Sequence, residues 1–431
     1  MTREISIEDA AMTETDKDRK RSFARRDFLK GAGAVATGAA ALGPVVSLAQ
    51  ESAAGANERL GVGFIGTGGR AGAHINIVLD LKKQGRVEPV AVCDVYGPRV
   101  RAAAERTGAK IYRNYRELLQ DPRVDVVCIA TPDRHHAPQA IDAVRAGKDV
   151  YVEKPLTHWL QFDLARQLAE EAEKHKRIVQ VGTQYMADPA YAEAHDLVQQ
   201  GAIGKVVHVQ AGYFRRGDWG ERMTVPDPDA KPGPDLDWEQ FLGDAPQVPY
   251  TVSRFFQWRL YWDYSGGPST DLLVHTFTPL FRLLDVDYPE RTVGTGGMFQ
   301  YNDLREVPDT FNMVIDYPGG PSVVLMNTLS NATGCSTFVR GTEGTLTFQG
   351  KQILLTRHDA KEPSHVIECP KHGDTAGLWS NFLDCVQSRE RPLSPVEIGA
   401  KVQAPLNMAI LSYRENKVAR FDREKHEIVL C

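Results

Sequence analysis

The sequence predicts an α/β chain in which a doubly wound parallel sheet is followed by an α+β domain with a large open-faced mixed or antiparallel sheet. Between residues 59 and 181, short apolar runs alternate with helical stretches, which is typical of parallel strands joined by helices. The run 124–130 is apolar almost throughout, as expected for a strand covered on both faces. After residue 184 the rhythm changes, and closely spaced strand-like runs predict a second sheet.

Hydrophobic periodicity places the elements of the first sheet. Strands are predicted over residues 60–65, 89–93, 124–130, 149–152 and 178–181, and helices over 71–84, 98–107, 136–146 and 162–175. The second half is predicted to hold helices over 189–200, 269–284, 378–387 and 395–412, and strands over 206–213, 292–299, 310–317, 322–328, 337–340, 345–348 and 352–356. Residues 215–267 are rich in Pro, Gly and Trp with little regular pattern, and loops of this length are usually functional or bind a partner.

Residues 1–58 are interpreted as an export signal and linker. Arg25 and Arg26 precede Asp-Phe-Leu-Lys and an Ala-, Gly- and Val-rich run over 31–48, which ends at Ser-Leu-Ala, a small-residue cleavage pattern. This arrangement predicts use of the twin-arginine export machinery and a periplasmic or extracellular location. Because the run is interrupted by glycines and Pro44 and lacks Ile and Phe, no stable membrane anchor is predicted.

The composition restricts the classes of molecule that the chain is expected to bind. Lys and Arg total 51 against 56 Asp and Glu, a net charge of −5, so the chain has no basic field for nucleic acid and a neutral small molecule is the expected substrate. The 6 cysteines are scattered without a Cys-x-x-Cys pair or a histidine at ligand spacing, which predicts neither a metal site nor a thiol redox centre. A disulfide among the later four stays open in an oxidising compartment.

A glycine-rich turn follows the first predicted strand. Gly66 and Gly68, with Ala71 at the start of a helix, form a dinucleotide-binding fingerprint, in which a pyrophosphate faces the helix N-terminus. Asp94 ends the second predicted strand, where its carboxylate would accept hydrogen bonds from the adenosine ribose. Since a carboxylate would repel a 2′-phosphate, NAD is favoured, with NADP left open.

Further polar residues follow later strands, at the edge where ligands of open α/β sheets bind. The motifs are Thr-Pro-Asp-Arg-His-His at 131–136, Ala-Gly-Lys at 146–148 and Glu-Lys-Pro at 153–155. Together with the glycine turn, they make the mature chain resemble the Gfo/Idh/MocA family of sugar and polyol oxidoreductases. The runs 237–243 and 258–267 and the Asp271/His275 pair resemble the branch of that family that carries twin-arginine signals.

The resemblance implies hydride transfer between nicotinamide and a carbohydrate carbinol, with Lys154, Asp271 and His275 at the catalytic positions. The residues themselves agree, because Asp271 and His275 are four apart on a predicted helix and an imidazole can take a hydroxyl proton. Lys154 would stabilise the alkoxide or share the proton relay. Where the family commonly has Gly and Asp, this chain has Leu273 and Thr278, so its pocket is expected to be bulkier or less polar.

Two sets of contacts are expected besides the catalytic residues. The cofactor contacts are Gly66, Thr67, Gly68, Gly69, Arg70, Asp94, Thr131, Pro132, His136, Glu153, Lys154 and Gln184. The weaker substrate candidates are Tyr213, Arg215, Trp258 and Tyr264. The aromatic residues of 215–267 suit either packing and subunit contact or stacking on a sugar ring.

The expected organisation is therefore a signal and linker (1–58), an NAD(P)-binding Rossmann domain (59–181) and a substrate-binding and oligomerisation domain (182–431). The expected activity is exported, NAD(P)-dependent oxidation or reduction of a sugar, glycoside or polyol. Two alternatives stay open: an NAD-dependent glycosidase that acts by transient oxidation and elimination, and a non-catalytic cofactor-binding module. A homo-oligomer formed through the open sheet is expected, because self-association would cover its apolar face.

Overall fold

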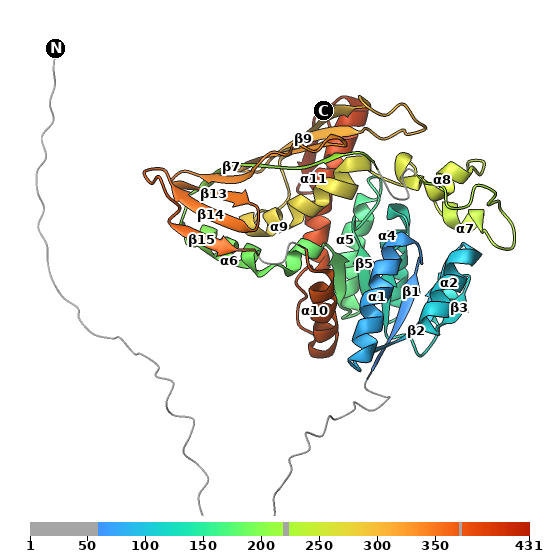
Figure 1. The fold of residues 1–431 in the computed structure, drawn as a ribbon. Helices are drawn as coiled ribbons and strands as arrows, with labels where there is room; N and C mark the ends of the chain where they lie inside the picture. The colour runs from blue at the N-terminus through green and yellow to red at the C-terminus, as the bar shows by residue number, and fades with distance from the viewer. Residues whose placement is uncertain (1–58, 219–223, 370–372) are drawn as a thin grey trace, which may run out of the picture. The chain divides into compact units, whose positions relative to one another are not determined.

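The computed structural model describes residues 59–218, 224–369 and 373–431, and this part of the chain is built around two sheets (Figure 1). Arg25, Arg26 and the rest of the predicted export signal lie outside the described residues. Within those residues, no helix has both the length and the apolar character needed to cross a membrane. All six cysteines fall inside the described part and are free thiols.

The first sheet has six parallel strands in the order β3-β2-β1-β4-β5-β6. This is the strand order of a doubly wound dinucleotide-binding sheet, so the predicted Rossmann domain is confirmed. The strands are β1 (Leu60–Ile65), β2 (Val87–Cys93), β3 (Lys110–Tyr112), β4 (Val126–Ile129), β5 (Asp149–Glu153) and β6 (Val179–Gly182). The helices are α1 (Gly69–Lys83), α2 (Gly97–Thr107), α3 (Tyr115–Leu119), α4 (Asp133–Arg145) and α5 (Phe162–Lys174). The sequence prediction missed β3 and α3, which are too short to show a period.

The apolar sequence of β4 is explained by the burial of this strand on both faces of the sheet. Val127 and Ile129 belong to the core on one face of the sheet, whereas Val126 and Cys128 belong to the core on the other. Successive side chains of a strand point to opposite faces, so a strand buried on both sides needs no polar alternation. Helices therefore cover the sheet on both faces and leave its strand ends to bind ligands.

The second sheet is mixed, and its strand order is β15-β14-β13-β12-β7-β10-β9-β8-β16-β17, with β11 beside β7. Strands β7 and β10 pair in parallel, and the other neighbours are antiparallel. The strands are β7 (Val206–Arg216), β8 (Arg291–Gly297), β9 (Thr310–Asp316), β10 (Ser322–Thr328), β11 (Ser330–Asn331), β12 (Thr337–Gly341), β13 (Gly344–Gln349), β14 (Gln352–Arg357), β15 (His365–Glu368), β16 (Ala419–Asp422) and β17 (Glu427–Leu430). The predicted α+β second half is confirmed; β11, β15, β16 and β17 were not predicted.

One face of the second sheet packs against helices. In β9, Phe311, Met313 and Ile315 are buried, and the residues between them are more exposed, which is the alternation of a sheet with one covered face. The buried side chains meet apolar residues of the helices α9 (Val274–Leu284) and α11 (Val396–Glu415), including Phe277 and Leu406. Apart from the short helices between residues 238 and 273 described below, the helical elements of this half are η1 (Gln184–Ala187), α6 (Pro189–Gln199), α9 (Val274–Leu284), α10 (Thr375–Ser388) and α11 (Val396–Glu415).

Helix α10 comes from the second half of the sequence but packs on the first sheet. Trp379 and Phe382 are fully buried with Phe64 of β1, and the Trp379 ring stacks on that of Tyr151 at 4.7 Å between centroids. The predicted boundary at 181/182 stays a prediction, because the chain after it returns to complete the core of the first sheet.

The predicted helix over 269–284 is not uniform. Ser269–Leu273 (η4) forms a π-helix, and the α-helix α9 starts at Val274. The prediction that Asp271 and His275 share the face of one regular helix is therefore wrong in detail, since a π-turn is wider and shifts the i, i+4 rows. A π-turn of a few residues has no sequence signal of its own, and such turns are frequent at functional sites.

The described part of the stretch 215–267 is largely irregular, as expected, but three short helical elements form in it. They are α7 (Trp238–Leu242), α8 (Val252–Phe256) and the 3-10 helix η3 (Trp258–Leu260). Phe241, Phe255, Phe256 and Tyr264 are buried together in a small aromatic core of this stretch. Figure 1 shows α7 and α8 beside α2 of the first domain.

Candidate active site and cofactor cleft

A cavity of about 650 Å³ opens at the carboxyl ends of the strands in the first sheet. Its size lies in the range of small-molecule and cofactor sites. Predicted cofactor residues line it, namely Gly66, Gly68, Gly69, Arg70, Asp94, Thr131, Pro132, His136, Glu153 and Lys154. It is also lined by residues of the stretch 215–267, namely Glu239, Gln240, Phe241, Gly243, Asp244, Phe255, Trp258 and Arg259.

The glycine turn between β1 and α1 fits a pyrophosphate. Gly66 has φ +82°, and a Cβ atom there would lie 2.9 Å from the carbonyl carbon and oxygen of Ala130. Only glycine suits that backbone. The turn leads directly into α1, which begins at Gly69, so the helix N-terminus faces the cavity and favours a negative charge there. The shape and polarity of this end of the cavity therefore match a dinucleotide.

Asp94 is fixed at the end of β2. Its Oδ2 accepts hydrogen bonds from the backbone N of Thr67 at 2.7 Å and from Thr67 Oγ1 at 3.0 Å, and its Oδ1 accepts from the backbone N of Tyr96 at 2.9 Å. Thr67 thereby ties the glycine turn to the strand that would hold the ribose. The contact of Asp94 with a ribose stays a prediction.

Glu153 is the centre of a largely buried hydrogen-bond network next to the cavity. Its Oε1 accepts from Arg70 Nε at 2.7 Å and from His74 Nε2 at 2.9 Å. Trp379 Nε1 donates to His74 Nδ1 at 2.9 Å, so His74 is a neutral ring with its proton on Nε2. Burial lowers the pKa of His74, in agreement with that state.

The same hydrogen-bond network keeps Glu153 ionised. Burial alone would raise the pKa of Glu153, but the Arg70 guanidinium and the hydrogen bond from His74 outweigh burial and hold it well below its usual value. A fixed carboxylate at this point orients the residue that follows it, Lys154, whose backbone N donates to Glu153 Oε2 at 3.2 Å. Sequence reasoning missed His74 and Trp379, because the histidine lies within an ordinary helix pattern and the tryptophan is 305 residues further along the chain.

Lys154 and Asp271 form an ion pair at the cavity wall. Lys154 Nζ lies 2.8 Å from Asp271 Oδ1 and donates to the Asp271 backbone O at 3.0 Å. The side chains are only 12% and 7% exposed. Arg259, which sequence reasoning did not single out, lines the cavity with its Nε 3.8 Å from the same carboxylate oxygen. Lys154 lines the cavity and Asp271 is not among its described lining residues, so the aspartate contacts the lysine from behind the cavity wall.

His275 follows Asp271 by one turn, in the first turn of α9. Its ring lies edge-on to that of Tyr185 in η1, with 6.2 Å between centroids, and is partly buried. The neighbouring Gln184 has a buried amide oxygen without a hydrogen-bond partner in the described part of the chain. A donor group of a ligand would satisfy that oxygen. Neither His275 nor Gln184 is among the described residues that line the cavity.

His136 joins two of the predicted cofactor turns. Its Nδ1 lies 2.6 Å from the backbone O of Pro155, and its Nε2 lies 2.8 Å from the backbone O of Thr131. Burial lowers the pKa of His136 to about 4, and a neutral ring donates to one carbonyl at a time. The ring therefore holds together the turns that follow β4 and β5.

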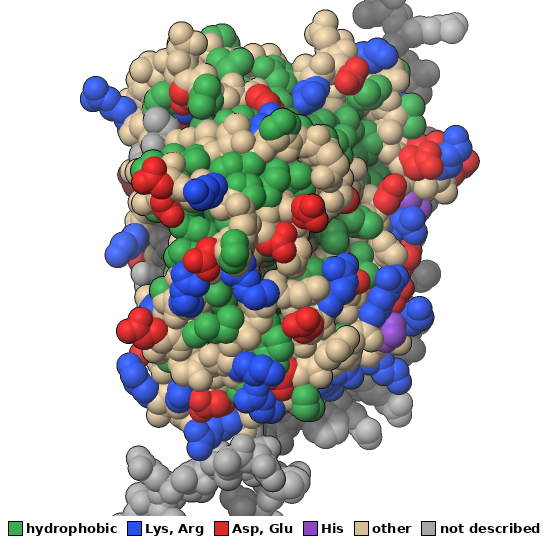
Figure 2. Space-filling view, turned by 90° about the vertical axis from the view of Figure 1, so that its right-hand side faces the viewer, with side chains coloured by type: hydrophobic (Ala, Val, Ile, Leu, Met, Phe, Trp, Pro, Cys, Tyr) green, Lys and Arg blue, Asp and Glu red, His purple; other side chains and the backbone are tan. Residues whose placement is uncertain are grey.

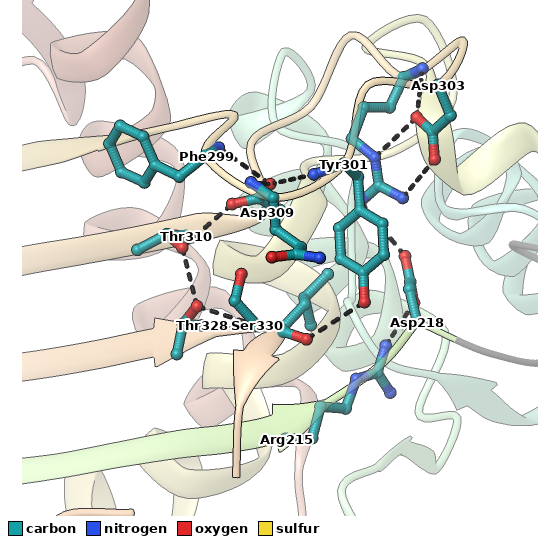
Figure 3. Close-up of polar contacts among 12 residues, drawn as sticks. Arg215, Asp218, Phe299, Tyr301, Asp303, Asp309, Thr310, Thr328 and Ser330 are labelled. Carbon is teal, nitrogen blue, oxygen red and sulfur yellow. Dashed lines mark hydrogen bonds and ion pairs between the residues drawn. The ribbon is translucent and has the colours of Figure 1, made fainter. Parts of the chain in front are cut away.

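The four substrate candidates have different surroundings. Trp258 lines the cavity, and the Arg259 guanidinium lies over its ring at 4.1 Å. Arg215 instead pairs with Asp218 at 2.5 Å, and Asp218 also faces Arg305 at 3.3 Å, in the network at the end of β7 that Figure 3 shows.

Tyr213 and Tyr264 are used in packing. Tyr213 is partly buried against the core of the second sheet, and its backbone O accepts from Asn327 Nδ2 at 2.5 Å. Tyr264 is fully buried in the aromatic core of 215–267, 5.3 Å from the ring of Phe241. Among the described lining residues of the cavity, Trp258 is the one substrate candidate present.

The described residues place no three His, Cys, Asp or Glu side chains together as metal ligands.

A family model described as an oxidoreductase family with an NAD-binding Rossmann fold matches residues 60–183, and one described as its C-terminal alpha/beta domain matches residues 190–430. The chain belongs to the Gfo/Idh/MocA oxidoreductase family. The cavity above the glycine turn lies in this NAD-binding Rossmann domain and is called the NAD cavity below.

Individual relatives either match less than half of the chain or share little sequence identity with it. An inositol 2-dehydrogenase of Rubrobacter xylanophilus is 36% identical over 165 residues, which cover 38% of this chain and 46% of the relative. A glycosyl hydrolase family 109 protein of a Shewanella species is 31% identical over 224 residues, which cover 45% and 47%. The chain thus spans about half the length of these relatives. The WlbA dehydrogenase of Bordetella pertussis, solved with NADH and UDP-GlcNAcA, shares the fold with a TM-score of 0.62 and 19% identity, covering 84% of this chain and 98% of WlbA.

Proposed function

We propose that this Gfo/Idh/MocA protein transfers hydride between a tightly held nicotinamide cofactor and a carbon that bears a hydroxyl group in a sugar, glycoside or polyol. The observation that carries the proposal is the Lys154–Asp271 ion pair at the wall of the NAD cavity. It places an ammonium group, held by a carboxylate, where a substrate oxygen would develop negative charge. The sugar and polyol names of the relatives support the substrate class.

The cofactor, when bound, supplies the hydride acceptor or donor. The chain supplies the rest of the chemistry. Lys154 donates a hydrogen bond to the reacting oxygen and stabilises its negative charge, while Asp271 fixes the position of the lysine. His275, one turn beyond Asp271, is proposed to take up the hydroxyl proton during oxidation and return it during reduction. Arg259 over Trp258 forms a further wall of the cavity against which a polar substrate could rest.

Export belongs to the same proposal. From the Arg25-Arg26 signal we propose that the chain belongs to the twin-arginine branch of the family and reaches the periplasm or the cell exterior already folded. Free NAD is scarce outside the cytoplasm, so a second substrate would recycle the bound cofactor in place. NADP is kept as a possible cofactor beside NAD. On the face in Figure 2, acidic and basic side chains are interspersed, which suits a small neutral substrate better than nucleic acid.

Self-association through the second sheet is also proposed. Val293 of β8, Val314 of β9 and Val324 of β10 lie side by side in register, and the first two are 40% and 42% exposed. Val366 on β15 is 44% exposed. A row of exposed β-branched side chains on a wide sheet supports a homo-oligomer that covers it. Sedimentation of the mature protein would test this, and a monomer at micromolar concentration would contradict it.

The decisive experiment for the activity starts from protein purified after export. We expect denaturation to release stoichiometric nicotinamide dinucleotide, whose identity and oxidation state are read by chromatography. Sugars, glycosides and polyols are then screened for reduction or reoxidation of the bound cofactor, followed by absorbance and fluorescence. Protein that is consistently free of cofactor and unable to bind NAD would overturn the proposal.

The match to a glycosyl hydrolase family 109 protein favours a second candidate, an NAD-dependent glycosidase that oxidises a ring hydroxyl transiently, eliminates the glycosidic bond and reduces the carbon again. Release of free sugar from a glycoside, with no net change in nicotinamide absorbance, would decide for it. His275→Ala separates a non-catalytic cofactor-binding module from both enzymes. The substitution would leave the behaviour of such a module unchanged, whereas either enzyme should lose most of its turnover.

A further inference from the structure

Residues 225–264, called the strap below, cross from the second half of the chain to the NAD cavity. Glu239, Gln240 and Phe241 of the strap line the same cavity as Gly66 and Asp94. The strap has its own aromatic core, which includes the fully buried Phe255, Phe256 and Tyr264. It is therefore a packed element with a defined surface toward the cavity.

One end of the strap is anchored beside β2. The backbone N of Gly97 donates to the backbone O of Asp235 at 2.7 Å, and the backbone N of Asp237 donates to the backbone O of Val95 at 3.0 Å. A Cβ at Gly97 would lie 2.2 Å from Asp235 Oδ1, so glycine permits this close approach. The strap thus adds backbone hydrogen bonds to the segment that directly follows Asp94.

Side chains reinforce the same anchor. The Tyr96 ring packs edge-on against the rings of Phe255 and Phe256 of the strap, at 5.6 and 5.5 Å between centroids, and its hydroxyl donates to Asp227 Oδ2 at 2.6 Å. Burial and the Asp227 carboxylate raise the pKa of Tyr96 to about 12, so the phenol keeps its proton. Arg101 of α2 pairs with Asp235 at 2.7 Å.

The middle of the strap, at Phe241 and Asp244, is anchored on α4. Arg134 Nε lies 2.8 Å from Asp244 Oδ1, and Arg134 Nη2 donates to the backbone O of Asp244 at 2.9 Å. His135 Nε2 lies 2.7 Å from the backbone O of Phe241. Burial lowers the pKa of His135, so its neutral ring donates to that carbonyl.

The two anchors flank the phosphate turn. Strands β2 and β4 are the two neighbours of β1 in the sheet, and the Gly66 turn leaves the end of β1 between them. One anchor follows β2 and the other follows β4. The strap therefore spans the end of β1, above the place where the adenosine and pyrophosphate halves of a dinucleotide would lie.

We propose that the strap closes over the adenosine half of the bound dinucleotide and sets the rate at which the cofactor leaves. This inference rests on the proposed NAD-dependent function. Release would require one anchor to open, with loss of several hydrogen bonds at once, whereas hydride transfer at the Lys154 end would not. An exported enzyme that meets no free NAD gains from such an arrangement, because its cofactor stays with the protein.

The test measures cofactor release in the full mature protein. Protein loaded with NADH is mixed with a large excess of NAD⁺, and the loss of bound NADH fluorescence gives the dissociation rate. Two variants each weaken one anchor without changing a residue that lines the cavity, namely Tyr96→Phe with Arg101→Gln, and Arg134→Gln. We expect each to release NADH about tenfold faster, the effect of losing hydrogen bonds to a charged group. Arg106→Gln is the matched control, because Arg106 lies on α2 but contacts Asn76 of α1.

The outcomes separate this inference from the function on which it rests. Wild-type protein that neither contains nor binds NADH would overturn the proposed function. Wild-type protein that holds NADH, with anchor variants that release it at the wild-type rate, would overturn the strap alone. Hydrogen exchange on the wild type gives a check that needs no variant: peptides from 225–264 should exchange more slowly with NADH bound, and equal exchange with and without NADH would contradict the inference.

Discussion

Lys154 Nζ lies 2.8 Å from Asp271 Oδ1, although 117 positions separate the two residues in the chain. The lysine follows β5 of the parallel sheet, and the aspartate lies in the π-helix that precedes α9 of the second half. Both side chains are shielded from solvent, so the pair is less screened than a surface ion pair. The pair joins the two halves of the protein at the wall of the NAD cavity.

Removal of either partner of this pair should abolish most turnover. We expect Lys154→Met and Asp271→Asn each to lower kcat by about 10²- to 10⁴-fold, the range for a positioned proton-transfer or charge-stabilising group. The double variant should be little worse than the poorer single variant, because the two groups act as a unit. Steady-state kinetics with the best screened substrate measures this, with NADH content checked in each variant. The exposed Lys174→Met is the control, and full activity in Lys154→Met would rule out the assignment.

His275→Gln should separate proton transfer from cofactor binding. The glutamine keeps a polar side chain beside Tyr185 but cannot take up a proton, so kcat should fall by about 100-fold or more while bound NADH is retained. Single-turnover reduction of the bound cofactor would show the loss directly. Unchanged single-turnover rates would assign His275 a packing role and leave the proton to another group.

Asp94→Ala should weaken NADH binding and reduce discrimination against NADPH. The carboxylate holds Thr67 by two hydrogen bonds and carries the charge that opposes a 2′-phosphate. We expect the Kd for NADH to rise about tenfold and the NADPH-to-NADH ratio of Kd values to fall by a similar factor. Fluorescence titration of stripped protein measures both. Asp80→Ala, an exposed change on α1, is the control, and equal ratios in wild type and Asp94→Ala would contradict the role.

His158 should make the fold sensitive to mild acid. Its buried ring accepts from the backbone N of Leu160 at Nδ1 and donates from Nε2 to the backbone O of Trp262, as a neutral imidazole does. Burial lowers its pKa from 6.5 to about 3. Between those values the unfolded state binds a proton that the native state does not, so stability is full above pH 6.5 and falls as the pH decreases toward 3.

Comparison of the wild type with His158→Gln separates the contribution of this histidine to the pH dependence of stability from that of the carboxylates. Between pH 6.5 and pH 4, the free energy of unfolding of the wild type should fall by about 3 kcal/mol more than that of the variant. Chemical denaturation at each pH gives both values. His426→Gln changes an exposed ring and should keep the wild-type slope. Parallel slopes for the wild type and His158→Gln would show that the ring is not held neutral.

Some features follow from local sequence alone. Five strands of the first sheet were predictable because burial makes each of them a short apolar run, as in β4, whereas the short and largely exposed β3 was missed. The glycine turn was predictable because its backbone requires glycine at Gly66, where φ is positive. The motif residues after β4 and β5 were predictable as cavity residues because the carboxyl ends of parallel strands share one edge.

Other features depend on contacts between distant segments. The sequence alone determined the parallel sheet, the phosphate turn and the candidate Lys154, because the sheet follows from the alternation of apolar runs and helical stretches, and the other two from short motifs of adjacent residues. Only the tertiary structure decided that Trp379 reaches His74, that Asp271 pairs with Lys154 and that the strap lies over the NAD cavity. These contacts join residues far apart in the chain, and their geometry is set by packing of whole elements rather than by local periodicity or turn chemistry.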